Sequence, residues 1–439
     1  MTATERRGDS PLGSGSETGP PHVLVIAYHF PPAGGVPVRR ALRVLRHLPA
    51  HGMRCSVLTA DTPYDPYHGL DPGGIGSVPE TVRVVRAAAH SGLERGLASA
   101  WNALGALRRR STPASEAPAT TDAGAQGAGV RRWVQDHVLF PDPKRGWASA
   151  AAREATALHA LDPVEAIWAT GYPWSSFWLA RELARTLGVP YALDYRDGWT
   201  ANPRRLWDTA RQAELERDLV AGAGLVTAAT DWLRDDLNTR FAPEPKAETM
   251  TNGYDPDEFP PLDDAMLDPE HCVLTYTGTF NDAWPPSPAD QSPWWLLQAI
   301  QRLGAGTRGA LRVRLVGRVP DAVRQAVARE RLGDVVEIVG PVAHDHALAH
   351  QVAADHLLLI VSDGPRSGAI LTGKLVEYVG ARRPVLALVP EGEARRAVQA
   401  HGLGQVVGPR DVERIAELLS GIVTEWRARG RPPAAPVVR

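Results

Sequence analysis

The chain has 439 residues, of which 44% are hydrophobic and 22% charged, an ordinary balance for a globular enzyme. Because single hydrophobic cores stop growing at about 250 to 300 residues, we expect two domains. The 48 basic and 50 acidic residues leave a formal net charge of −2, which argues against the strongly basic domain of a nucleic-acid-binding protein. The two cysteines, Cys55 and Cys272, have no metal-ligand spacing and fit a reducing compartment.

The N-terminal residues 1–19 are polar and rich in Gly, Ser and Thr, so we expect a disordered tail there. This tail lacks the apolar stretch that a signal peptide requires. No apolar run approaches the roughly 20 residues of a membrane span. The sequence therefore predicts a cytoplasmic protein with no transmembrane segment, and it gives no indication of the oligomeric state.

Apolar strands and amphipathic helices alternate from residue 20 onward. The run His22 to Phe30 is typical of a buried first strand, and a glycine loop with a helical pattern from Pro37 to His51 follows it. Further strands of this unit are expected at Arg54–Thr59, Val82–Val85, Ala166–Thr170, Tyr191–Asp194, Leu225–Ala228 and Ala247–Met250. We expect one doubly wound domain over residues 20–262, with a mobile insertion at about 108–130 that is rich in Ser, Thr, Pro, Ala and Gly.

A polar, turn-rich stretch from Tyr254 to Pro261 indicates a hinge. Beyond it, strands are expected at Val273–Tyr276, Leu311–Val316, Val335–Val339, Leu357–Val361 and Val385–Leu388. They predict a second doubly wound domain over residues 263–428, followed by a Pro- and Arg-rich tail at 429–439. The expected fold class is α/β, with two Rossmann-like domains facing a central cleft where ligands bind.

A Gly-Lys helix start lies near the C-terminus. Gly373 lets the backbone approach a ligand, the following amides form the positive end of a helix, and Lys374 adds a mobile cation. Glu377 lies one turn later on the same face, where its oxygens can accept hydrogen bonds from a ribose diol. With the preceding Leu371 and Thr372, these residues predict a nucleotide site; the alternative is an exposed surface ion pair.

The expected strand ends of the second half supply more donor-binding candidates. Thr277, Gly278 and Thr279 end its first strand, Arg318 follows the second strand, and Val342 follows the third. Hydroxyls, backbone amides and a guanidinium at one sheet edge suit a diphosphate, although ordinary turn chemistry explains the same residues.

The glycines after the first strand of the first half are a further donor-binding candidate. Gly34 and Gly35 also let backbone come close to a ligand. The G-x-G-x-x-G fingerprint of a dinucleotide enzyme is missing there, which disfavours a dehydrogenase.

The strand ends of the first half are rich in charged and aromatic residues. Arg196 is a candidate anion clamp and Asp197 a candidate hydroxyl acceptor, and we group both with Lys374 as catalytic candidates. Tyr172, Trp174 and Trp199 offer flat faces on which the sugar ring of an acceptor can pack; core packing is the alternative.

Taken together, five segments resemble the GT-B glycosyltransferases, specifically glycosyltransferase family 4. They are Tyr28–Pro32 with Gly34–Val36, Asp194–Trp199, Thr251–Asp255, Tyr276–Thr279 and Gly373–Tyr378. The resemblance implies a retaining transferase that binds a nucleotide-diphosphate sugar in its C-terminal domain and an acceptor in its N-terminal domain. Glu377 then matches the ribose-binding glutamate of the family. The donor is a substrate, so no cofactor is expected, and the favoured mechanism needs no metal because amides and basic side chains offset the departing charge.

The sequence also departs from the family pattern. Ala369 stands where the family commonly has a second acidic residue, eight positions before the glutamate, and the run Thr279–Trp284 lacks the usual Arg and Lys. Two alternative functions stay open for this fold: a nucleotide-sugar epimerase, and a relative that binds the donor without glycosyl transfer or couples it non-glycosidically. No motif identifies the donor sugar or the nucleobase. The expected acceptor is either a small natural product or a glycan.

Overall fold

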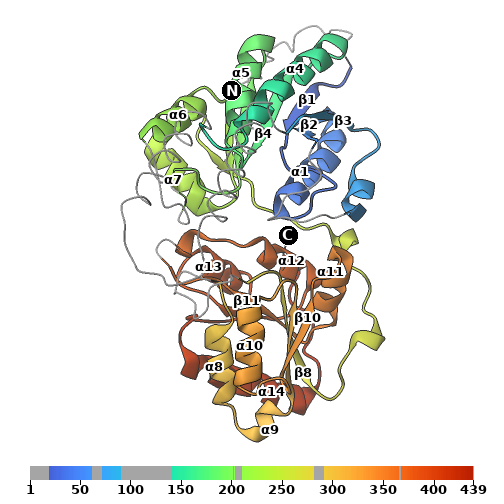
Figure 1. Cartoon of the computed structure of the whole chain (residues 1–439), viewed down its shortest axis with the longest axis vertical. Coiled ribbons are helices and arrows are strands. Elements are labelled where there is room, and N and C mark those ends of the chain that lie inside the picture. The colour runs from blue at the N-terminus through green and yellow to red at the C-terminus, as the bar shows by residue number, and fades with distance from the viewer. Residues whose placement is uncertain are drawn as a thin grey trace, which may run out of the picture.

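The computed structural model describes residues 19–61, 72–89, 140–200, 202, 210–280, 291–364 and 367–438. They form two α/β lobes, one above the other in Figure 1. The insertion predicted at 108–130 lies outside the described residues. Residues 1–18 of the predicted N-terminal tail also lie outside them.

The N-terminal lobe is built on a parallel seven-stranded sheet of order β3-β2-β1-β4-β5-β6-β7. Its strands are β1 (His22–Ile26), β2 (Arg54–Ala60), β3 (Arg83–Ala87), β4 (Ala166–Gly171), β5 (Tyr191–Tyr195), β6 (Leu225–Ala228) and β7 (Glu248–Thr249). Its helices are α1 (Val36–His47), α4 (Arg145–Leu161), α5 (Ser175–Leu187), α6 (Ala210–Ala221) and α7 (Asp231–Phe241), with short 3-10 turns η1 (Leu48–His51) and η2 (Pro72–Ser77).

Strand β1 shows why the sheet is buried on both faces. Leu24 and Ile26 belong to the core cluster that includes α4 and α5, whereas Val23 and Val25 belong to the cluster that includes α1. Successive side chains point to opposite faces of a strand, so a strand covered on both sides has to be apolar at every position. The continuous apolar run His22 to Phe30 therefore predicted a buried strand, although the strand itself ends at Ile26.

The C-terminal lobe is built on a parallel six-stranded sheet of order β10-β9-β8-β11-β12-β13. Its strands are β8 (Cys272–Thr277), β9 (Leu311–Val316), β10 (Val336–Gly340), β11 (His356–Ile360), β12 (Val385–Leu388) and β13 (Gly404–Val407). Its helices are α8 (Trp294–Gln301), α9 (Ala305–Arg308), α10 (Asp321–Arg329), α11 (His344–Ala353), α12 (Gly373–Ala381), α13 (Glu393–Ala400) and α14 (Val412–Arg429). Strand β13 was not predicted, because it is a short edge strand whose first three residues are not buried.

The segment between the lobes runs along helix α12. It contains the turns η3 (Pro256–Glu258) and η4 (Asp264–Met266), and η5 (Ser367–Ala369) precedes α12. A Cβ on Gly380 would lie 2.3 Å from the Phe259 ring and 2.8 Å from the Tyr254 ring, so this glycine lets the linker pack against the helix. The linker is therefore fixed to the helix that carries the predicted nucleotide site.

The C-terminal segment returns to the same junction. Ala435 donates its amide hydrogen to the Arg382 carbonyl at 2.8 Å, and the Tyr254 hydroxyl lies 3.4 Å from the Val438 carbonyl oxygen. Figure 1 accordingly places the C-terminus between the two lobes. Among the helices in the described ranges, none combines the length and the hydropathy needed to cross a bilayer.

Candidate functional site

The start of helix α12 lies against the end of strand β8. A Cβ on Gly278 would fall 2.2 Å from Lys374 Cε, and Lys374 Nζ lies 5.4 Å from the centroid of the Tyr276 ring. Gly278 has a φ of 137°, which L side chains rarely adopt. The structure thus brings together Gly278 and Lys374, which the sequence separates by almost a hundred residues, and the lysine needs a glycine beneath it.

A second glycine makes this edge of the sheet close-packed. Gly317, which follows β9, has a φ of 123°, and a Cβ there would lie 2.1 Å from the Gly278 carbonyl oxygen. The Gly278 amide donates to the Val316 carbonyl at 2.8 Å, and the Gly317 amide to the Gly340 carbonyl at 2.8 Å. Three strand ends therefore pack backbone against backbone at this edge, with no side chain of Gly278, Gly317 or Gly340 between them.

The other donor-binding candidates surround this backbone. Thr277 is buried, Thr279 and Arg318 are exposed, and Val342 is half-buried just after β10. Leu371, Thr372 and Gly373 are half-buried, with Thr372 at the N-cap of α12. In the N-terminal lobe, Gly34 is buried, and Gly35 caps the start of α1 with a φ of 93°.

Glu377 is held by residues of both lobes. Gln351 Nε2 donates to Glu377 Oε2 at 3.0 Å and also to Thr277 Oγ1 at 2.9 Å. The second carboxylate oxygen, Oε1, accepts a hydrogen bond from Arg39 Nη1 within an ion pair. Because Arg39 belongs to α1, this pair joins the N-terminal lobe to the helix of the predicted ribose site.

Arg196 is bound to the backbone of its own lobe. Its Nε donates to the Gly171 carbonyl at 2.7 Å and its Nη2 to the Tyr172 carbonyl, so the guanidinium fixes the loop that follows β4. Burial lowers the pKa of Arg196 to about 10, against the opposing charges of Asp197 and Asp194. Asp197 is exposed. A catalytic part for Arg196 and Asp197 stays a prediction.

Two of the three predicted acceptor-binding rings are packed on each other. Trp174 and Trp199 stack with their centroids 5.0 Å apart and an interplanar angle of 4°, and they are 1% and 0% exposed. Tyr172 is half-buried and meets Trp174 edge-on at 6.2 Å. In this structure the two indoles act as core, so an acceptor contact by either of them stays a prediction and requires these rings to separate.

A buried ion pair that sequence reasoning missed lies beneath this region. Asp194 is fully buried and accepts hydrogen bonds from Arg40 Nε at 2.8 Å and Arg40 Nη2 at 2.6 Å. The hydroxyls of Thr170 and Thr227 donate to the same carboxylate at 2.8 Å each. Arg40 and Asp194 are 154 residues apart, and no local pattern marks such a pair.

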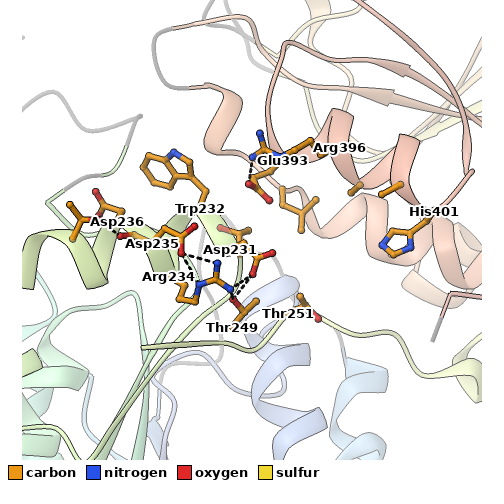
Figure 2. Close-up of a pocket in the computed structure, with 15 residues that line it drawn as sticks. Asp231, Trp232, Arg234, Asp235, Asp236, Thr249, Thr251, Glu393, Arg396 and His401 are labelled. Atoms are coloured by element: carbon orange, nitrogen blue, oxygen red, sulfur yellow. Dashed lines mark hydrogen bonds and ion pairs between the residues drawn. The ribbon is translucent and has the colours of Figure 1, made fainter. Parts of the chain in front are cut away.

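A cavity of about 760 Å³ opens between the lobes (Figure 2). Helix α7 lines it from the N-terminal side, helix α13 lines it from the C-terminal side, and Leu371 connects it to the loop before α12. Its side chains are of the kinds that bind hydroxyl-rich ligands, namely carboxylates, guanidiniums, hydroxyls and one indole. They include Trp232, Arg234, Asp235, Glu393 and Arg396.

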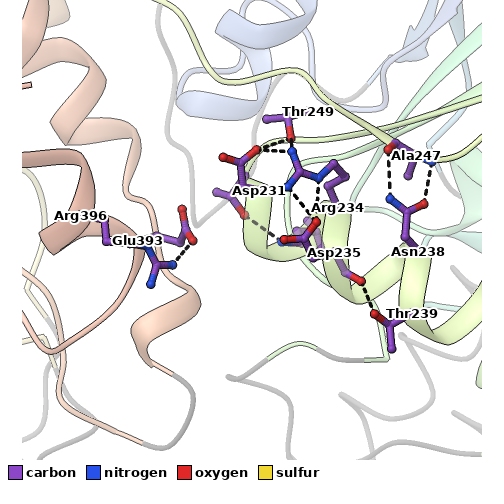
Figure 3. A network of polar contacts seen from close by, with 11 residues as sticks. Asp231, Arg234, Asp235, Asn238, Thr239, Ala247, Thr249, Glu393 and Arg396 are labelled. Carbon is purple, nitrogen blue, oxygen red and sulfur yellow. Dashed lines mark hydrogen bonds and ion pairs between the residues drawn. The ribbon is translucent and has the colours of Figure 1, made fainter. Parts of the chain in front are cut away.

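The charged residues of the cavity are linked into pairs (Figure 3). Arg234 donates to Asp231 Oδ1 at 2.7 Å and to Asp235 Oδ1 at 2.8 Å, and Glu393 pairs with Arg396 on the opposite wall. The hydrogen bond to Asp235 raises the pKa of Arg234, and the charge of Glu393 also contributes. None of the described residues forms a group of three or more His, Cys, Asp or Glu side chains that could hold a metal ion.

Comparisons with known proteins agree with this architecture. Residues 95–253 match the family described as glycosyl transferase 4-like domain. No curated protein matches the chain. Solved structures with a similar fold include sucrose-phosphate synthase from Thermosynechococcus elongatus, with 17% identity over 93% of this chain and 90% of that one and a TM-score of 0.57.

Two further solved structures are similar over nearly the whole chain. HepE from Anabaena, in complex with UDP, has 13% identity over 93% of this chain and 92% of that one, with a TM-score of 0.57. WaaG, a glycosyltransferase involved in lipopolysaccharide biosynthesis, has 15% identity over 93% and 92%, with a TM-score of 0.56. At these identities the likeness shows the fold, and the expected two-domain α/β architecture is confirmed. The chain has the GT-B fold of glycosyltransferases and resembles glycosyltransferase family 4.

Proposed function

We propose that the chain is a retaining glycosyltransferase that moves a sugar from a nucleoside-diphosphate sugar to a hydroxyl or amine of a small natural product or glycan. One observation carries the proposal: Lys374 lies over Gly278 at the bare backbone edge of the sheet, and Glu377 follows on the next turn of the same helix. A cation at the start of a helix suits a diphosphate, and a carboxylate one turn away suits a ribose.

The donor would lie along the carboxyl edge of the C-terminal sheet. Lys374 and the first amides of α12 face its diphosphate, Thr279 and Arg318 lie at the same edge, and Val342 borders the place of the base. Backbone groups of the loop before α12 take the sugar contacts that a carboxylate at Ala369 would make. A Cβ on Gly368 would lie 2.5 Å from the Glu391 carbonyl oxygen, so this loop is packed against the segment that leads into α13.

Transfer breaks the bond between the anomeric carbon and the diphosphate oxygen. The acceptor oxygen or nitrogen attacks from the leaving-group face and forms the new bond, and the departing phosphate oxygen takes the acceptor proton. Negative charge grows on the diphosphate during this step, and fixed amides with Lys374 stabilise it without reorganisation. The proposal therefore includes neither a metal nor a cofactor. Closure of the lobes would expel water and limit hydrolysis of the donor.

The acceptor is proposed to enter through the cavity between α7 and α13. This cavity touches the donor loop at Leu371 and has the size of a small-molecule site. Trp232 supplies an aromatic face, and Arg234 and Glu393 supply polar groups from opposite lobes. A cytoplasmic location stays a prediction.

The donor half of the proposal is tested by thermal shift with UDP, GDP, ADP, CDP and dTDP. We start with UDP because the solved structure of HepE holds it. At least one diphosphate should raise the melting temperature of the protein, and Lys374→Ala should reduce that rise. No rise with any of the five diphosphates would overturn the donor site.

The transfer half is tested by incubating the protein with the matching nucleotide sugar, a panel of acceptors and EDTA. A glycosylated product whose anomeric configuration matches the donor by NMR is expected, and EDTA should leave its yield unchanged. An isomeric sugar nucleotide formed without acceptor would indicate an epimerase. Donor binding without any glycoside would favour a non-glycosidic coupling enzyme or a non-catalytic relative.

A further inference from the structure

The carboxylate of Glu377 is contacted from two directions. Gln351 of α11 donates to Oε2 at 3.0 Å, and Arg39 of α1 pairs with Oε1. The Arg39 and Glu377 side chains are only 17% and 18% exposed. A charged pair with so little exposure is less screened by solvent than a surface pair, so it orients both partners more strongly.

Gln351 is oriented by its donor contacts. It is fully buried, and its Nε2 donates both to Thr277 Oγ1 and to Glu377 Oε2. Its carbonyl oxygen Oε1 has no hydrogen-bond partner among the described residues. A buried acceptor without a partner is unfavourable, because it has lost its hydrogen bonds to water. The Gln351 side chain keeps this orientation because its two amide hydrogens bond to Thr277 and Glu377.

These two contacts leave Glu377 able to bind a ligand. An ionised carboxylate has about four lone-pair sites, two on each oxygen. Arg39 and Gln351 occupy one site on each oxygen, so one more site on each oxygen is available to a hydroxyl group. A ribose diol has two such hydroxyls, which means that neither protein contact has to break when the ribose arrives.

Helix α1 contains arginines that serve as internal comparisons. Arg43 pairs with Glu258 at 3.4 Å and Arg46 pairs with Asp255 at 2.7 Å, and both of these acids belong to the linker. Arg39, one helical turn before Arg43, reaches α12 instead. The helix is therefore anchored to the linker independently of Arg39, and loss of Arg39 leaves that anchoring in place.

We propose that Arg39 and Gln351 are positioning residues that hold the Glu377 carboxylate for the ribose of the donor. Ribose recognition is then assembled from both lobes, and the N-terminal lobe contributes to donor binding through α1. This inference rests on the proposed function, because it requires that Glu377 binds the ribose.

The test compares UDP with 2′,3′-dideoxy-UDP, which lacks both ribose hydroxyls, by isothermal titration. The dideoxy compound loses both hydrogen bonds to the charged carboxylate, so the intact protein should bind UDP at least about tenfold more tightly than the dideoxy compound. Arg39→Met and Gln351→Met should each reduce this preference to about threefold or less. Arg39→Lys should restore part of it. In a Glu377→Gln background neither substitution should have a further effect on the preference.

Arg46→Met is the matched control, since it removes an ion pair of the same helix without touching Glu377. It should keep the preference of the unmodified protein. An unchanged preference in both Met variants, or tighter UDP binding by Arg39→Met, would overturn the inference; the latter result would mean that Arg39 blocks the carboxylate. If the unmodified protein binds both compounds equally, this inference fails while the donor site stands. If it binds no diphosphate at all, the proposed function itself fails.

Discussion

The two lobes have the same architecture, yet they use the polar residues at their strand ends differently. In the C-terminal lobe, Gly278 and Gly317 leave bare backbone at the sheet edge, and Lys374 projects over it. In the N-terminal lobe, Arg196 binds two backbone carbonyls and Asp194 is enclosed by Arg40 and two threonines. The strand ends thus carry a lysine packed over glycine backbone in one lobe, and buried charged groups bonded within the lobe in the other.

The first prediction addresses the N-terminal side of this comparison and has the largest expected effect. Asp194→Asn should lower the free energy of unfolding by about 3 to 5 kcal/mol, because it leaves the buried Arg40 guanidinium without its counter-charge. Chemical unfolding followed by tryptophan fluorescence measures this, since Trp174 and Trp199 lie in the core of the same lobe. The exposed Asp197→Asn is the control and should change stability by no more than about 0.5 kcal/mol. Equal effects of the two substitutions would mean that Asp194 is not structural.

The second prediction addresses the C-terminal side. Lys374→Ala should lower the rate of sugar transfer by about 100- to 1000-fold, as expected for the loss of one group that stabilises the departing charge. The melting temperature should stay within a few degrees, because Lys374 is half-buried and rests on a glycine. Single-turnover kinetics and thermal unfolding check the two halves, with the exposed Lys246→Ala as control. Unchanged turnover with intact folding would remove Lys374 from the mechanism.

The sequence relates the C-terminal candidate residues to one another more directly than the N-terminal ones, for a physical reason. Gly373, Lys374 and Glu377 lie within five positions, and helix geometry alone places the lysine and glutamate on one face. The strands of both lobes were predicted apart from the edge strand β13, because a sheet buried on both sides needs apolar runs. The contacts that decide how a polar residue is used are long-range. Arg39 and Glu377 are 338 residues apart, and no local pattern connects them.

The aromatic residues of the N-terminal lobe also make long-range contacts that the sequence does not predict. Trp174 and Trp199 follow different strands, so the sequence could place both at the mouth of the sheet but could not show that they stack on each other. Gln351 was missed altogether, because a glutamine in a helix has no local signature of burial. Its role follows only from its contacts with Thr277 and Glu377.

The third prediction tests the close packing of the C-terminal strand ends. Gly317→Ala should destabilise the protein by about 1 to 3 kcal/mol, because alanine at a φ of 123° is strained and its Cβ would meet the Gly278 carbonyl. UDP affinity should fall as well, since the Gly278 backbone would have to move. Gly253→Ala is the control, because a Cβ there meets nothing within 4 Å. Thermal unfolding and titration with UDP measure both effects, and similar results for the two variants would contradict the packing argument.

The fourth prediction concerns pH and again separates the lobes. Burial at the start of β11, helped by the nearby charge of Arg383, lowers the pKa of His356 to about 4. An unfolded histidine titrates near about 6.5, so between these values the unfolded chain binds a proton that the folded chain does not. The stabilising contribution is therefore complete above about pH 6.5 and is lost as the pH falls toward 4, by about 1 to 3 kcal/mol in total.

His356→Leu should remove this part of the pH dependence, because leucine does not titrate. Unfolding free energies at pH 7.0 and 4.5 measure it, and the exposed His346→Leu should retain the full difference. Burial also lowers the pKa values of His22 in the N-terminal lobe and of His350 in α11, so some pH dependence should remain in the variant. The loss should appear in the unfolding of the C-terminal lobe, where His356 lies beside β8 and β12. A variant that loses as much stability as the unmodified protein on acidification would show that His356 is already protonated or solvated in the folded state.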